Sequence, residues 1–119
     1  MESILTSIKK LIGPDQDNKA FDADIMIHIN TALMSLTQLG IGPTEGFFIT
    51  SELDTWEKFL GERKDLEAVK TYIYLKVRLV FDPPTNSAVI ETMKATITEL
   101  EWRLNHQAEH SEIQNGEEA

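Results

Sequence analysis

The chain has 119 residues, which is the size of one domain and leaves no room for a second hydrophobic core. The absence of cysteine excludes disulfides, thiolate metal sites and cysteine nucleophiles together. The formal net charge of −9 argues against a nucleic-acid-binding protein, because phosphate binding requires clustered Lys and Arg side chains. No stretch approaches the roughly 20 apolar residues of a membrane helix, so we expect a soluble, intracellular protein.

The first predicted element is a short amphipathic helix over residues 3–12, where apolar side chains recur on one helical face. Gly13 and Pro14 then form a stop signal. The polar loop over residues 15–19 begins with Asp-x-Asp but lacks the glycine and glutamate of a calcium-binding EF-hand. We therefore interpret it as a solvated loop.

A second, longer helix is expected over residues 22–39, and its main apolar stripe consists of Ile25, Ile29, Ala32, Leu33, Leu36 and Leu39. Ile27 and Met34 fall almost opposite that stripe. A second apolar strip on a helix of a small domain predicts burial from two sides, either by this chain or by a neighbouring copy.

The middle of the chain predicts a loop followed by a short helix. Residues 41–50 are too short and too rich in glycine and proline for a helix. Ser51 and Asp54 have the spacing of a capping box, which predicts that the short helix begins at Ser51 and ends near residue 60.

The third long helix, over residues 65–81, is the most apolar. Besides its main stripe, Tyr72, Leu75 and Leu79 line a second side. A helix that is apolar on both sides belongs at the centre of a bundle or between subunits. We therefore include this strip among the candidate interface residues.

A sharp corner follows at Phe81, Asp82, Pro83 and Pro84, because the residue before a proline is forced out of the helical region. The two prolines limit the backbone, so the corner should be stiff and should set the angle between the helices that flank it. The sequence also allows Asp82 to cap a helix end or to pair with Arg78 or Arg103.

The last helix is expected to begin at a cap formed by Asn86 or Ser87 and to end near residue 105. Trp102 projects almost opposite its apolar face and joins the candidate interface residues. Residues 106–119 are polar, acidic and without periodicity. We therefore divide the chain into a helical domain over residues 1–105 and a flexible C-terminal tail over residues 106–119.

These elements predict an all-α fold, a compact bundle of three to four main helices plus one short helix. The candidate interface residues exceed the apolar surface that such a bundle can hide internally. They are Ile27, Met34, Tyr72, Leu75, Leu79 and Trp102. We therefore expect self-association.

No catalytic constellation can be assembled from the sequence. His106 and His110 have the i, i+4 spacing of paired metal ligands, but a zinc site needs further ligands and supporting contacts. The glycines are scattered rather than clustered in a phosphate-binding loop, and no serine has an evident base partner. We expect no enzymatic activity, no cofactor and no metal site.

Two segments of the sequence resemble a known family. The first reads EAVKTYIYLKVRLVFDPPTNSAVIE and the second ITELEWRLN. Together they resemble the connector proteins of long-tailed bacteriophages, also called adaptor, head-completion or DNA-packaging proteins. ILTSIKKLIG, DADIMIHINTAL, QLGIGP and TWEKFL are similar to the N-terminal part of that family, so the resemblance covers residues 1–105.

The resemblance implies a structural virion protein at the head–tail interface, made in the host cytoplasm. It implies a homo-oligomeric ring, expected to be a dodecamer, beneath the portal. Its partners would be the portal protein and the next tail-proximal connector or stopper protein. Double-stranded DNA would pass through the ring without sequence-specific binding, and no membrane is involved. The alternative is a small acidic helical module that regulates or sequesters a partner.

Overall fold

The computed structural model describes residues 2–13, 19–61 and 65–118, with the backbone alone beyond residue 109. Its helices are α1 (Ile4–Ile12), α2 (Asp22–Gln38), α3 (Trp56–Leu60), α4 (Leu66–Phe81) and α5 (Ser87–Glu118). Within the described ranges the chain is helical with connecting loops, so the predicted all-α fold is confirmed. Most of the polar loop predicted over residues 15–19 lies outside the described residues.

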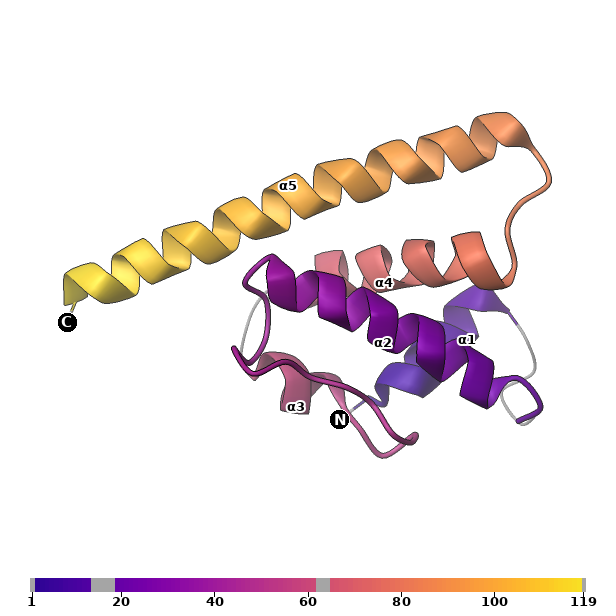
Figure 1. The fold of residues 1–119 in the computed structure, drawn as a ribbon, viewed down its shortest axis with the longest axis horizontal. Helices are drawn as coiled ribbons and strands as arrows, with labels where there is room; N and C mark the ends of the chain where they lie inside the picture. Colours follow the sequence, from indigo (N-terminus) through magenta and orange to yellow (C-terminus); the bar gives the residue numbers. More distant parts are fainter. Residues whose placement is uncertain (1, 14–18, 62–64, 119) are drawn as a thin grey trace.

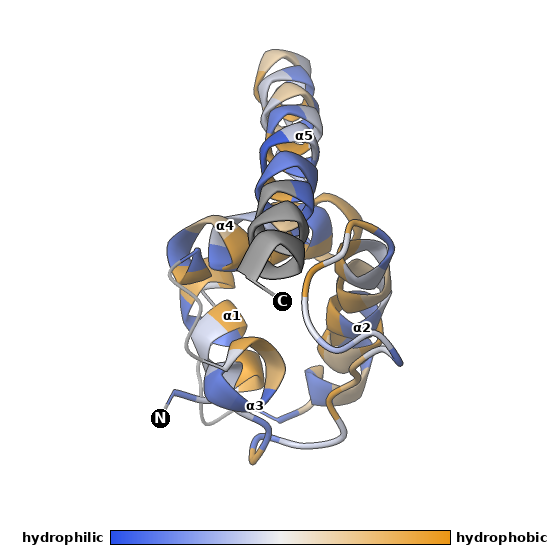
Figure 2. Ribbon diagram, turned by 90° about the vertical axis from the view of Figure 1, so that its left-hand side faces the viewer, coloured by the Kyte–Doolittle hydropathy of each residue, from blue (hydrophilic) through white to orange (hydrophobic). Residues whose placement is uncertain are grey.

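The body of the molecule consists of α1, α2 and α4, and α5 lies across it (Figure 1). Viewed along α5, α2 and α4 lie on opposite flanks of the body, with α5 above them (Figure 2). Each of these helices contributes fully buried apolar side chains to one continuous core, including Ile8, Ile29, Ile73 and Leu104. Burial of these residues supplies the main driving force for the fold.

The first turn of α1 ties the N-terminal segment to the middle of the chain. The Ser3 hydroxyl caps α1 by accepting a hydrogen bond from the Thr6 amide (3.2 Å). The Ile4 amide donates to the Asp54 carbonyl (3.0 Å), and the Trp56 amide donates to the Glu2 carbonyl (3.2 Å). These backbone pairs fix the start of α3 beside the start of α1.

The predicted start of the short helix at Ser51 is wrong, because α3 begins at Trp56 with Thr55 as its cap. The Asp54 carboxylate instead accepts hydrogen bonds from the amides of Thr50 (2.7 Å) and Ser51 (3.3 Å). The pair that resembled a capping box therefore closes a turn before the helix. An aspartate side chain commonly competes with helix formation in this way.

The last helix was expected to end near residue 105, but α5 continues to Glu118. The Asn105 side chain donates to the Leu39 carbonyl (3.3 Å), and Ala108 is buried beside Gly40. These contacts hold α5 against the end of α2 beyond the expected boundary. The division into a domain and a flexible tail stays a prediction.

Candidate functional site

The corner between α4 and α5 is held by an aromatic contact. Phe81, the last residue of α4, packs edge-to-face on Phe21 at the start of α2, with ring centroids 5.7 Å apart. The Asp82 amide donates to the Arg78 carbonyl (3.0 Å) and closes the last turn of α4. Pro84 is half-buried. The corner is thus fixed by packing to α2 as well as by its own backbone.

The start of α5 is fixed by its cap. The Asn86 side-chain oxygen accepts hydrogen bonds from the amides of Ala88 (2.8 Å) and Val89 (3.3 Å), so Asn86 rather than Ser87 provides the cap. Arg103 forms an ion pair with Glu99 on its own helix (2.8 Å), on the outer face of α5. Arg103, one of the two arginines suggested as a partner of Asp82, is therefore paired with Glu99 instead.

Three of the predicted interface residues are on the surface. The exposed fractions are 60% for Ile27, 51% for Met34 and 69% for Trp102. The Trp102 ring stacks on His106 at 5.5 Å, with the two rings almost parallel. All three side chains are therefore exposed on this chain, and their role in an interface stays a prediction.

The other three predicted interface residues are covered by the chain itself. Tyr72 and Leu75 are buried, Leu79 is half-buried, and the Tyr72 hydroxyl donates to the Glu101 carboxylate of α5 (2.8 Å). Burial and this contact with Glu101 raise the pKa of Tyr72, so its hydroxyl stays protonated as a donor. The second apolar side of α4 thus packs against α5 of the same chain.

One exposed apolar surface lies on α2, and we call it the α2 stripe: Ile27, Thr31 and Met34. These residues follow one another at i, i+4 and i+7, which places them on one helical face. All three are exposed, and the Thr31 hydroxyl donates to the Ile27 carbonyl one turn earlier (3.0 Å). The stripe has no charged side chain.

A second apolar surface is the α4–α5 groove, an open groove of about 480 Å³ near the corner. It is lined by Thr71 and Leu75 of α4 and by Asn86, Ala88, Val89, Thr92, Met93 and Thr96 at the start of α5. None of these residues is charged, and most of the exposed lining is apolar. The groove exists because the first turns of α5 stand away from α4.

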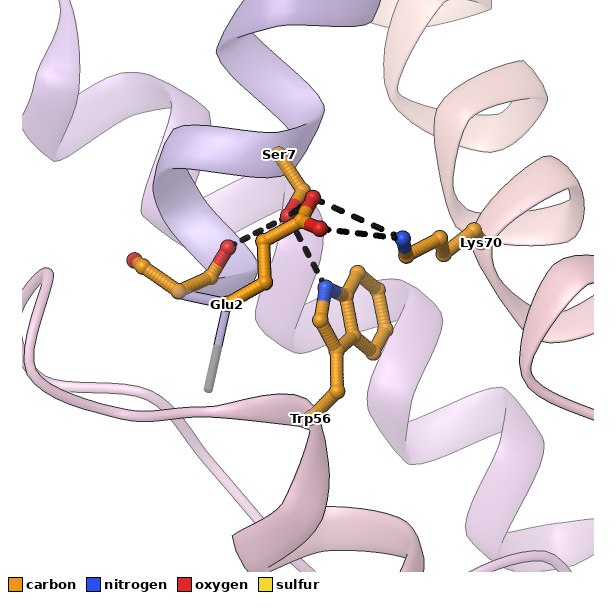
Figure 3. Close-up of polar contacts among 5 residues, drawn as sticks. Glu2, Ser7, Trp56 and Lys70 are labelled. Carbon is orange, nitrogen blue, oxygen red and sulfur yellow. Dashed lines mark hydrogen bonds and ion pairs between the residues drawn. The ribbon is translucent and has the colours of Figure 1, made fainter.

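A polar cluster that is buried at Ser7 and Trp56 and exposed at Glu2 joins α1, α3 and α4, and sequence reasoning missed it (Figure 3). The Trp56 indole donates to the Ser7 hydroxyl (2.9 Å), which also lies within hydrogen-bond distance of the Glu2 carboxylate. Lys70 pairs with Glu2 (3.4 Å). The Ser7 hydrogen bond and the nearby Lys70 charge hold the pKa of Glu2 below its ordinary value. The only sequence signal was a serine on the apolar face of α1.

A second contact that sequence reasoning missed fixes the loop after α2. The Asn30 side chain accepts a hydrogen bond from the Ile49 amide (2.7 Å) and donates to the Ile49 carbonyl (3.0 Å). This pair of bonds buries Ile49 and leaves Phe48 exposed beside it. An asparagine within the helical pattern was the available signal.

Comparison with known proteins decides the family. A sequence model of the phage connector protein family matches residues 4–111, which include all five helix starts and the corner. The chain belongs to the phage connector protein family. No curated protein and no solved structure gives a significant match to it.

Family membership makes the connector a structural component of a phage particle that associates with other head and tail proteins. Among the described residues, no group of three or more His, Asp or Glu side chains is placed to hold a metal ion. His106 is engaged by Trp102, and the side chain of His110 lies outside the described residues. No helix in the described ranges has both the length and the apolar character of a membrane span.

Proposed function

We propose that this connector forms a ring beneath the portal at the head–tail interface, extends the DNA channel and docks the next tail-proximal protein. The observation that carries the proposal is the family match over residues 4–111. The exposed apolar surfaces support it, because contiguous exposed apolar side chains mark protein–protein contacts. The ring is expected to be a dodecamer with the portal protein as one neighbour.

The charge of the chain supports a role as a conduit for DNA. A net charge of −9 disfavours the retention of single or double strands, which proteins hold with tracks of basic side chains. Carboxylates that face a channel repel phosphates and keep the duplex mobile. The proposal therefore includes passage of double-stranded DNA without sequence-specific binding, and it requires no enzymatic activity, cofactor or membrane.

Within that function, residues 81–84 set the angle between α4 and α5. A ring of identical subunits needs the same geometry in each copy. The Phe81–Phe21 contact and the two prolines supply a stiff corner whose geometry is reproducible. The corner is architectural in this account and does not itself recognise a partner.

The C-terminal residues 106–119 are proposed to dock on the portal during assembly. A deletion that tests this must spare Ala108, since that residue is buried beside Gly40. Truncation after Glu109 should leave the fold intact and weaken binding to portal-bearing heads. Unchanged binding of the truncated protein to portal-bearing heads would show that the tail does not dock on the portal.

The location of the connector is tested by immunogold labelling of complete particles and of tailless, DNA-filled heads. The proposal predicts one labelled vertex per head, and label at the head–tail junction of complete particles. Label distributed over the shell, or along the tail tube, would contradict it.

A further inference from the structure

We propose that the α2 stripe of one subunit docks in the α4–α5 groove of the next subunit. This inference rests on the proposed ring and names the two surfaces that form its repeating contact. The occupant of the groove is therefore a second copy of this chain, contributing Ile27, Thr31 and Met34.

The first argument is charge. Two copies of a chain with net charge −9 repel one another wherever their acidic side chains face each other. The α2 stripe and the lining of the α4–α5 groove are both free of charged side chains. The side chains that form the two surfaces can therefore be buried without a desolvation cost for a charge of their own.

The second argument is that the hydroxyl groups in both surfaces already have partners. In the groove, Thr71 donates to the Glu67 carbonyl (2.9 Å), Thr92 to the Ala88 carbonyl (3.0 Å) and Thr96 to the Thr92 carbonyl (2.9 Å). Thr31 of the stripe is bonded in the same way. Because each hydroxyl is satisfied within its own helix, an apolar partner can cover these threonines without leaving a buried donor unpaired.

The third argument is size and shape. At the helical rise of about 1.5 Å per residue, the stripe from Ile27 to Met34 is about 10 Å long and the groove from Ala88 to Thr96 about 12 Å long. Small side chains such as Ala88 let a partner helix approach closely. The contact is a helix face lying in an apolar groove, with Ile27 and Met34 as its anchors.

The fourth argument is the placement of the two surfaces. The stripe is exposed on α2, whereas the groove lies between α4 and α5. In Figure 2, α2 and α4 lie on opposite flanks of the body. A contact between two different surfaces is heterologous and repeats from subunit to subunit. Such a contact closes into a ring when its rotation permits.

Cross-linking tests the pairing directly, because the chain has no cysteine of its own. The full-length double variant Met34→Cys/Thr92→Cys is treated with a short bismaleimide, both as concentrated free protein and when bound to portal-bearing heads. Both positions are exposed, so the fold should tolerate the substitutions. We expect a ladder of covalent multimers on a denaturing gel.

Three controls make the result specific. Each single variant should lose the ladder, since the stripe faces a groove and not another stripe. The double variant Met34→Cys/Thr98→Cys should lose it too, because Thr98 lies on α5 outside the groove lining. The pairing would be overturned if the single variant Met34→Cys formed cross-linked dimers as efficiently as the Met34→Cys/Thr92→Cys variant formed multimers. It would also be overturned if the Met34→Cys/Thr98→Cys variant gave an equally strong ladder.

The outcome is separable from that of the proposed function. If no ladder forms in free protein or on heads, while the connector still binds heads saturably, the pairing is wrong and the location beneath the portal stands. If a ladder forms but heads are not bound, the pairing stands and the location is wrong.

Discussion

The hydrogen bond between Trp56 and Ser7 is a sharp test of how the body is held together. Trp56 is 2% exposed and Ser7 is 3% exposed, so the hydrogen bond from the indole N–H to the Ser7 hydroxyl is shielded from water. The Ser7→Ala variant therefore leaves a buried donor unsatisfied, at a cost of about 1–3 kcal/mol. For a domain of this size, 2 kcal/mol lowers the melting temperature by about 8 °C.

The assay is urea unfolding followed by circular dichroism, with thermal unfolding as a second measure. The matched control is Thr98→Ala, an exposed position on α5, which should change the free energy of unfolding by less than about 0.5 kcal/mol. In a Trp56→Phe background the donor is already gone, so Ser7→Ala should cost about 1–2 kcal/mol less than in the wild type. Equal costs in the two backgrounds would refute the hydrogen-bond argument.

Three further predictions concern pH, the seat of α5 and the loop after α2. The pKa of Glu2 is lower in the folded protein than its ordinary value of 4.5. The ionised carboxylate therefore stabilises the fold at pH values above 4.5, and this contribution is lost as the pH falls through the folded pKa. Glu2→Gln should therefore flatten the dependence of the melting temperature on pH below about 4.5, and an unchanged slope would contradict this. Leu104→Ala should lower the free energy of unfolding in urea by about 2–5 kcal/mol, because Leu104 is a fully buried side chain of α5. Leu53→Ala, at an exposed position, should lower it by less than about 0.5 kcal/mol. Similar costs for the two variants would count against the packing of α5. Gly42→Ala should lower the free energy of unfolding by at least about 1–2 kcal/mol, because Gly42 has φ +85° and an alanine Cβ at this position would collide with the Phe59 ring. A variant as stable as the wild type would rule out that loop conformation.

Sequence periodicity located most of the fold because helix faces and helix ends are local properties. The glycine and proline signals and the Asn86 cap placed both ends of α1, α2 and α4, and the start of α5, to within one or two residues. The start of α3 was missed because Ser51 and Asp54 can close either a helix or a turn, and the backbone pairing with residues 2–4 favours the turn. That pairing is a tertiary contact which local patterns do not encode.

Local sequence patterns also could not show which apolar helix faces stay exposed in the fold. The helical pattern identified two apolar sides on α2 and on α4, but it could not tell which element covers the second side. On α4 the chain's own α5 covers Tyr72 and Leu75, whereas on α2 the second side stays exposed at Ile27 and Met34. The groove was missed because it depends on how far the start of α5 stands from α4, which is set by the corner and by contacts near Ala108.

The contacts near Ala108 also explain why the extent of α5 was underestimated. An acidic sequence without apolar periodicity gives no signal for a packed helix. In the structure, one alanine beside Gly40 and one hydrogen bond from Asn105 to Leu39 are enough to seat that part of the helix.

The most direct test of the central claim is the mass of connector bound to purified DNA-filled heads, measured by light scattering as the protein is titrated. The account predicts saturable binding at a mass equal to one ring per portal-bearing head, and no binding to shells that lack the portal. A connector that stays free of portal-bearing heads, or that binds shells with and without a portal equally, would contradict it.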